Sequence, residues 1–249
     1  MLHMEAESEI IQKMRYQVDN WDEQQELLKG PKKLPQRTDP SLHQHVQLCS
    51  SNTNSTSLSA YNVTVYQEHG ITDFLESLSS FFKRHNLDPN VQSYEVGWNL
   101  NTLFHVLIKQ VIPYHSCQVT YDCQESGSKK TDLFRSTSCW RGEGPRYDCV
   151  LVQGWPKSSV FFARVLGLFS VSYHAQCYRL GILRPFIKKH RNKLTGFIEL
   201  EEGQGQYEFC FIDSLIRAVH IIPPTLTNKR STVQDLVDGD AYLRFISMN

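Results

Sequence analysis

Apolar residues recur at helical spacing near the start of the chain. Between Glu5 and Leu28 they stand three, four or seven positions apart, which predicts one amphipathic helix within residues 1–30. Residues 31–59 carry few large apolar side chains and many Pro, Ser, Thr and Asn residues. Because such a segment cannot bury enough surface to offset the entropy of ordering it, we predict a flexible linker there.

Apolar residues in 60–143 recur partly at strand spacing and partly at helical spacing, which predicts a mixed α/β region. Tyr61, Val63 and Val65 alternate with polar residues, which is a strand-like pattern. The stretch ITDFLESLSSFFKRH places its large apolar side chains on one helical face, and LNTLFHVLIKQVIP favours a helix that stops at its final proline. The segment CQVTYDC alternates as a strand does and leads into the polar loop QESGSKK.

Residues 144–249 change to short β-like runs separated by turn residues. The runs are Tyr147 to Gln153, Val160 to Val171, Cys177 to Leu183, Thr195 to Glu202, Gln206 to Ile212 and Arg217 to Ile222. Short strands without amphipathic helices between them predict a small antiparallel β-barrel or sandwich. The segment EEGQGQYE has the glycines of a tight hairpin turn. The expected fold class is α+β, with helical N-terminal segments before a β-barrel domain.

Composition and charge indicate an intracellular chain. Lys and Arg (26) balance Asp and Glu (26), so the net charge identifies no partner. No apolar run approaches the roughly 20 residues that cross a bilayer, and the N-terminus lacks the apolar core of a secretory signal. The 7 cysteines are scattered and odd in number, which indicates reduced thiols rather than a disulfide framework. We expect no membrane partner.

Positive charge is concentrated in the segment RPFIKKHRNK, between two predicted strands. Its bases are Arg184, Lys188, Lys189, Arg191 and Lys193. A loop of this composition can lay several cations along a phosphate backbone and bind DNA with an affinity that depends on salt but not on sequence. We take these residues as the nucleic-acid-binding site. The alternative is a solvated connection without a partner.

Spacing argues against a metal site or a nucleophile. Cys117, Cys123, Cys139 and Cys149 are too far apart to include the tight pair that usually opens a zinc site. In SYHAQC, a histidine and a cysteine three positions apart would face opposite sides of a strand. We therefore expect no metal, no cofactor and no small-molecule substrate.

One aspartate, Asp148, opens an apolar run beside two arginines. A two-metal nuclease needs carboxylates gathered from separate strands, and this aspartate has no obvious companion. We predict instead that Asp148 pairs with Arg146 or Arg141 at the start of a strand. The acidic segment DLVDGD fails the residue order of a calcium loop. The chain is therefore not expected to be an enzyme.

Five segments occur in an order that resembles a known family. They are GEGPRYDCVLVQ, VFFARVLGLFSV, YRLGILRPF, YEFCFIDSLIRAVHIIPP and LVDGDAYLRF. Together they resemble the C-terminal tail that follows the catalytic core in fungal transposase-like proteins of the Plavaka and Kyakuja-Dileera-Zisupton type, over roughly Leu103 to Phe245. In that family the catalytic carboxylates belong to an RNase H-like core upstream of the tail. The resemblance therefore implies no catalytic residue here.

The segments YDCVLVQ and VFFARVLGLF are also similar to the first strands of bromo-adjacent homology (BAH) barrels of chromatin proteins, so residues 144–249 are expected to form an SH3/BAH-like barrel. The expected function is a non-catalytic, transposon-derived accessory or interaction module in the nucleus. Its partner is DNA or a chromatin or transposase protein. Three alternatives stay open: a barrel whose Trp155, Tyr173 and Tyr178 cage a methylated lysine, a hydrolase centred on Cys177 or Asp148, and a degraded remnant.

Overall fold

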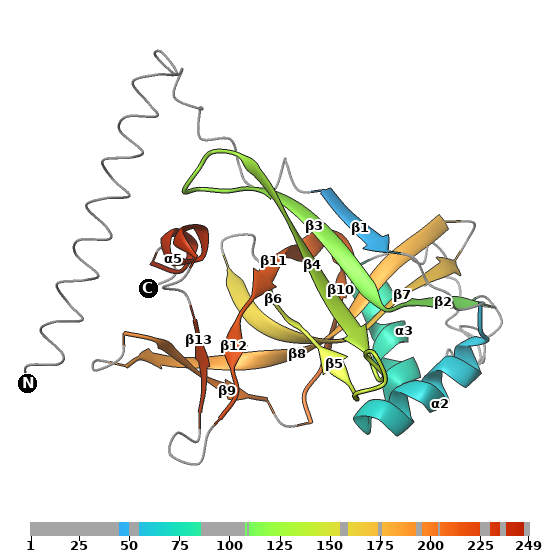
Figure 1. Cartoon of the computed structure of the whole chain (residues 1–249). Coiled ribbons are helices and arrows are strands. Elements are labelled where there is room, and N and C mark those ends of the chain that lie inside the picture. Colours follow the sequence, from blue (N-terminus) through green and yellow to red (C-terminus); the bar gives the residue numbers. More distant parts are fainter. Residues whose placement is uncertain are drawn as a thin grey trace, which may run out of the picture. The chain divides into compact units, whose positions relative to one another are not determined.

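Antiparallel strands make up most of the part of the chain that the structure, a computed structural model, describes (Figure 1). The described residues are 45–49, 55–85, 108, 110–154, 159–173, 176–192, 196–203, 205–224, 230–234 and 238–246. The predicted helix within residues 1–30 and most of the predicted linker lie outside them, as do Trp155, His174 and Lys193. The expected α+β class, rich in antiparallel strands, is confirmed.

Two antiparallel sheets are found among these residues. The smaller has the order β1-β3-β4-β5, and the larger has the order β11-β6-β7-β8-β9-β13-β12, with β10 added along β8 and β2 along β7. The smaller sheet contains β1 His45–Cys49, β3 Ser116–Asp122, β4 Lys129–Thr137 and β5 Arg146–Tyr147. The larger contains β2 Val111–Tyr114, β6 Cys149–Gln153, β7 Val160–Tyr173, β8 Gln176–Arg191, β9 Ile198–Glu202, β10 Glu208–Phe211, β11 Leu215–Val219, β12 Ile221–Ile222 and β13 Ser231–Val233.

The two ends of the larger sheet are consecutive in the chain. Only His220 separates β11, which pairs with β6, from β12, which pairs with β13. These strands and their neighbours share one apolar interior, to which helix α5 (Gly239–Ile246) contributes Ala241 and Phe245. The buried members are Cys149, Leu151, Phe162, Phe186, Ile198, Leu200, Ile216, Val219, Val233, Ala241 and Phe245.

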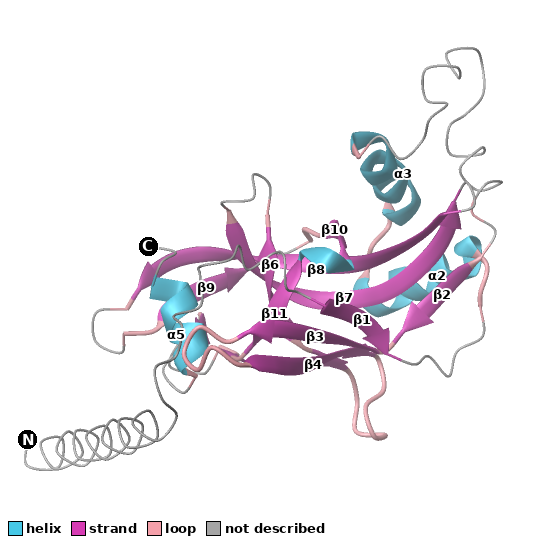
Figure 2. Ribbon diagram, turned by 90° about the horizontal axis from the view of Figure 1, so that it is seen from above, coloured by secondary structure: helices cyan, strands magenta, loops and turns pink. Residues whose placement is uncertain are grey.

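A second apolar layer joins the smaller sheet to the larger one. Figure 2 shows β3 and β4 beside β7 and β11. Period-two alternation in β3 turns Cys117 and Val119 inward, and Phe134 of β4 joins them. They pack against Val150 and Val165 of the larger sheet, so the two sheets bury a common interior.

Helices α2 (Leu58–His69) and α3 (Phe74–Arg84) pack on the C-terminal half of β7 and the N-terminal half of β8 (Figure 2). The helical face predicted for ITDFLESLSSFFKRH is confirmed as α3. The strand-like reading of Tyr61, Val63 and Val65 is wrong, because these residues lie in α2. Residues four apart on a helix share a face, so Tyr61 and Val65 are buried while Val63 is 51% exposed.

Two further local expectations are corrected. The helix predicted for LNTLFHVLIKQVIP is wrong for its last three residues, which lie in strand β2, and residues 100–107 and 109 lie outside the described residues. The hairpin predicted at EEGQGQYE is not formed, because β9 pairs with the second half of β8 and β10 with the first half. Among the described residues, no helix has the length and apolar character needed to cross a membrane.

Candidate functional site

The predicted basic loop is not a loop. Arg184, Lys188, Lys189 and Arg191 all lie in the second half of β8, and Lys193 is outside the described residues. This half of the strand was not predicted because residues 187–190 are all exposed, so no buried apolar face marks it.

Antiparallel pairing places acidic residues of β9 across from this basic strand. Arg184 lies 3.7 Å from Glu202, and Lys189 lies 2.6 Å from Glu201. The hydrogen bond from Lys189 lowers the pKa of Glu201. A phosphate backbone would therefore have to compete with carboxylates that these two bases already hold.

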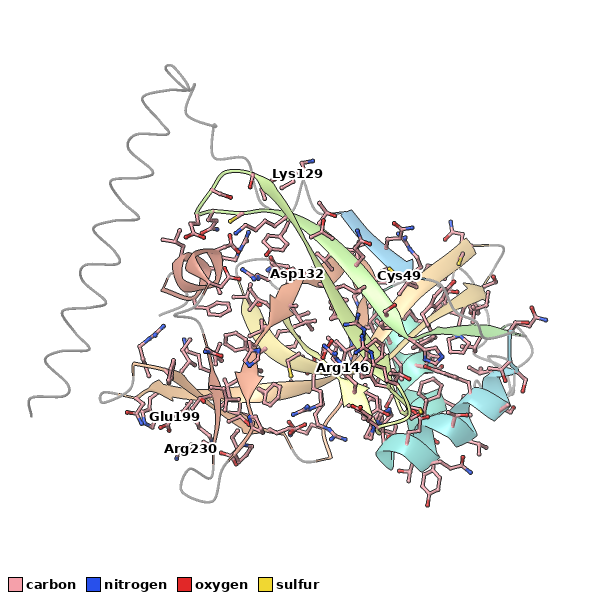
Figure 3. All side chains as sticks on the ribbon, in the orientation of Figure 1. Cys49, Lys129, Asp132, Arg146, Glu199 and Arg230 are labelled. Carbon is pink, nitrogen blue, oxygen red and sulfur yellow. The ribbon has the colours of Figure 1, made fainter. Side chains whose placement is uncertain are left out.

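Strand β9 also pairs with an arginine that lies outside β8. Glu199 accepts a 2.6 Å hydrogen bond from Arg230 and another from the side-chain amide of Asn192, and both lower its pKa. Glu199 and Arg230 face each other in Figure 3. The β8–β9 face is thus a surface of paired charges.

Asp148 takes the structural role that was predicted. Its Oδ1 accepts a 2.9 Å hydrogen bond from the Arg146 side chain, and its Oδ2 accepts one of 2.9 Å from the backbone N–H of Arg135. The predicted pairing with Arg146 is confirmed. Through these bonds Asp148 ties β4 and β5 to the start of β6.

Next to Asp148, three arginines surround one indole ring. The guanidinium carbons of Arg135, Arg141 and Arg146 lie 4.2, 5.1 and 5.3 Å from the centre of the Trp140 ring. Guanidinium groups at these distances are attracted by the negative face of the ring. We call residues 135–146 the Trp140 hairpin.

Backbone hydrogen bonds stabilise the connection between β4 and β5. Trp140 N–H donates to the Gly144 carbonyl at 2.7 Å, and Glu143 N–H donates to the Trp140 carbonyl at 2.9 Å. Arg141 has a φ of 53°, in the left-handed region that disfavours residues other than glycine by about 1–2 kcal/mol. Gly142 and Gly144, with φ of 78° and 125°, accept such angles without that penalty.

Positive charge is in excess at the Trp140 hairpin. Arg146 is paired with Asp148. Among the described residues, neither Arg135 nor Arg141 has a carboxylate within salt-bridge distance. The segment FRSTSCWRGEGPRY interleaves one tryptophan with three arginines, and this pattern is the signal from which the cluster could have been predicted.

A cleft of about 430 Å³ opens beside the Trp140 hairpin, and Arg146 belongs to both. The cleft lies between β5–β6, the β11–β12 segment and α5. Cys149, Val219, Ala241 and Phe245 line it with apolar surface. Two of its lining residues, Arg146 and Asp132, are labelled in Figure 3.

A buried ion cluster forms one wall of this cleft. Arg217, 5% exposed, donates to Asp240 at 2.6 Å and also to Asp238, and Arg244 donates to Asp240 at 2.7 Å. The guanidinium carbon of Arg217 lies 4.8 Å from the centre of the Tyr121 ring. The acidic segment DLVDGD thus supplies Asp238 and Asp240 as ion-pair partners of these arginines.

Three other kinds of site depend on metal ligands, on cysteine thiols and on an aromatic cage. Among the described residues, no three His, Cys, Asp or Glu side chains are grouped to hold a metal ion. Burial raises the pKa of the Cys149 thiol to about 11 and those of Cys117 and Cys210 to about 12. The alternative of an aromatic cage is wrong for Tyr173, which is 1% exposed, and the half-buried Tyr178 packs against Phe82.

Comparison of the chain with protein-family models, with curated proteins and with solved structures finds no match.

Proposed function

We propose that this chain is a non-catalytic accessory module that contacts nucleic acid through the Trp140 hairpin. The observation that carries the proposal is the gathering of three guanidinium groups on one indole ring, two of them without a carboxylate partner among the described residues. Guanidinium groups match phosphate oxygens with paired hydrogen bonds. An aromatic ring holds them in place, which reduces the entropy lost on binding.

The site differs from the one expected at β8. Arg184 and Lys189 face Glu202 and Glu201, so binding phosphate there would break existing ion pairs. Within the described part of the chain, Arg135 and Arg141 have no such pairs to break. Hence we assign the phosphate contact to the hairpin and treat the β8 bases as its matched control.

We further propose that the larger sheet is an SH3/BAH-like barrel and that the chain derives from the tail of a transposase-like protein. The single residue between β11 and β12 and the apolar interior shared by the strands around them support the barrel. Two of the segments that carry the resemblance, YEFCFIDSLIRAVHIIPP and LVDGDAYLRF, are joined by the Arg217–Asp240 pair, which supports a common folded unit.

The test is equilibrium binding of the purified full chain to a fluorescein-labelled DNA oligonucleotide at low salt. The double variant Arg135→Gln/Arg141→Gln should bind at least about tenfold more weakly, because two charge-assisted contacts are lost. The control variant Lys188→Gln/Lys189→Gln should bind almost as the wild type does. Equal losses in both variants, or no binding by the wild type, would overturn the proposal.

A further inference from the structure

We infer that the cleft beside the Trp140 hairpin takes the base of a single-stranded nucleic acid whose phosphates lie on that hairpin. This inference rests on the proposed function and adds to it the class of nucleic acid. In this arrangement the hairpin contacts the phosphate backbone of the nucleic acid, and the cleft holds the base of one unstacked nucleotide.

The two features are continuous. Arg146 lines the cleft, and its guanidinium carbon lies 5.3 Å from the centre of the Trp140 ring. A nucleotide whose phosphate lies on the Trp140 hairpin, next to this arginine, would have its base at the mouth of the cleft. A volume of about 430 Å³ falls in the range of roughly 300–1,000 Å³ typical of small-molecule sites.

The charges that line the cleft are already paired. Arg146 is bound by Asp148, Arg164 by Glu202, and Arg217 by the aspartates described above. The cleft therefore offers a phosphate group no advantage over Arg135 and Arg141, which have no carboxylate partner among the described residues. A neutral, flat group with hydrogen-bonding edges fits it better, and nucleobases are such groups.

Two side chains on the cleft wall remain available for a base edge. His220 and Gln234 line the cleft, and within the described part of the chain neither side chain makes a hydrogen bond. The backbone N–H of Gln234 donates to the His220 carbonyl at 2.9 Å, which fixes the two residues beside each other. A glutamine amide can donate to and accept from a base edge at once.

The apolar part of the wall suits the faces of a base. Val219 and Phe245 belong to the apolar interior shared by β11, β12 and their neighbours, and they reach the cleft from that side. In a duplex the base faces are stacked and its edges paired, so a base can enter such a cleft only from a single strand or after it is flipped out. A single strand avoids the free energy of unpairing.

The test compares three fluorescein-labelled probes on the full chain: a 12-nucleotide single strand of mixed sequence, the same strand annealed to its complement, and heparin. Wild type should bind the single strand more tightly than the duplex. The variant His220→Ala/Gln234→Ala should lose about tenfold in single-strand affinity and keep its heparin affinity. The control Gln47→Ala/His115→Ala changes the same residue types outside the cleft and should leave all three affinities unchanged.

The outcomes separate the two proposals. If the cleft variant leaves single-strand affinity unchanged, or lowers heparin affinity equally, the inference about the cleft is wrong while phosphate binding at the hairpin stands. If the wild type binds none of the probes at low salt, the proposed function itself fails. A thermal melt of each variant shows whether any loss of binding follows from unfolding.

Discussion

Arg217 donates a 2.6 Å hydrogen bond to Asp240 at a place from which water is excluded, since the two side chains are 5% and 0% exposed. The pair joins β11 to α5. Asp240 also accepts from Arg244 and from the backbone N–H of Gln124 at 2.5 Å, so it holds three segments together. Because charges buried in this way are stable only when paired, the cluster fixes α5 against the sheets.

The first prediction concerns Asp240. Replacing it by Asn removes the charge that compensates two buried arginines, and the free energy of unfolding should fall by about 3 kcal/mol. Urea denaturation measures the change. The control is Asp213→Asn, whose partner Arg179 lies 3.6 Å away and is 46% exposed; it should cost less than about 1 kcal/mol. Similar losses of unfolding free energy in the two variants would show that the buried ion cluster stabilises the fold no more than an exposed ion pair does.

The second prediction concerns the hydroxyl of Ser136, which is buried and has no hydrogen-bond partner among the described residues. Removing it in Ser136→Ala should raise the free energy of unfolding by about 1 kcal/mol, because an unpaired polar atom no longer has to be desolvated. Ser170 is the matched control, since it is equally buried and its hydroxyl lies 3.5 Å from that of Tyr114. Ser170→Ala should be neutral or destabilising. A loss in Ser136→Ala would contradict this reading.

The third prediction concerns pH. The His69 side chain is 5% exposed, and burial lowers the pKa of its imidazole below the ordinary 6.5. The unfolded chain therefore binds a proton at a higher pH than the folded chain does. His69 contributes fully to stability above pH 6.5, and this contribution is lost as the pH falls toward the folded pKa.

Urea titrations at pH 7.5, 6.5 and 5.5 measure this effect. The wild type should lose stability over this range, and His69→Gln should lose less of it. The exposed His115→Gln should follow the wild type. Parallel curves for wild type and His69→Gln would rule out a depressed pKa at this position.

The fourth prediction concerns the ring that gathers the arginines. Trp140→Leu keeps an apolar side chain but removes the π face, so the three guanidinium groups lose their common support. Affinity for a single-stranded oligonucleotide should fall about fivefold, with little change in the melting temperature. Tyr66→Leu, which removes an exposed aromatic ring on α2, should leave binding unchanged. Unaltered binding by Trp140→Leu would show that the ring does not organise the site.

Local pattern was enough to predict much of the fold. Strands β6, β7, β9 and β10, the helix at Phe74–Arg84 and the Asp148–Arg146 pair all depend on residues close in sequence. Helix α2 was missed because residues spaced by two and four fit a strand and a helix alike until the packing partner is known.

The ion pairs between separate segments could not be predicted, because they depend on contacts that form only in the folded chain. The β8 bases look free in the sequence, yet strand register sets Lys189 beside Glu201. The Arg217–Asp240 pair likewise joins two segments that no local rule connects. Conversely, Arg135 and Arg141 did not stand out in the sequence, and only the folded hairpin shows that they share one ring.

The most direct test of the nucleic-acid interface is the salt dependence of binding to a single-stranded oligonucleotide. The slope of log Kobs against log salt should be shallower in Arg135→Gln/Arg141→Gln than in wild type by about 1.4, which corresponds to two lost phosphate contacts at about 0.7 each. Lys188→Gln/Lys189→Gln should keep nearly the wild-type slope. A slope that is unchanged by the hairpin variant but reduced by the β8 variant would contradict the account and return the interface to the basic strand.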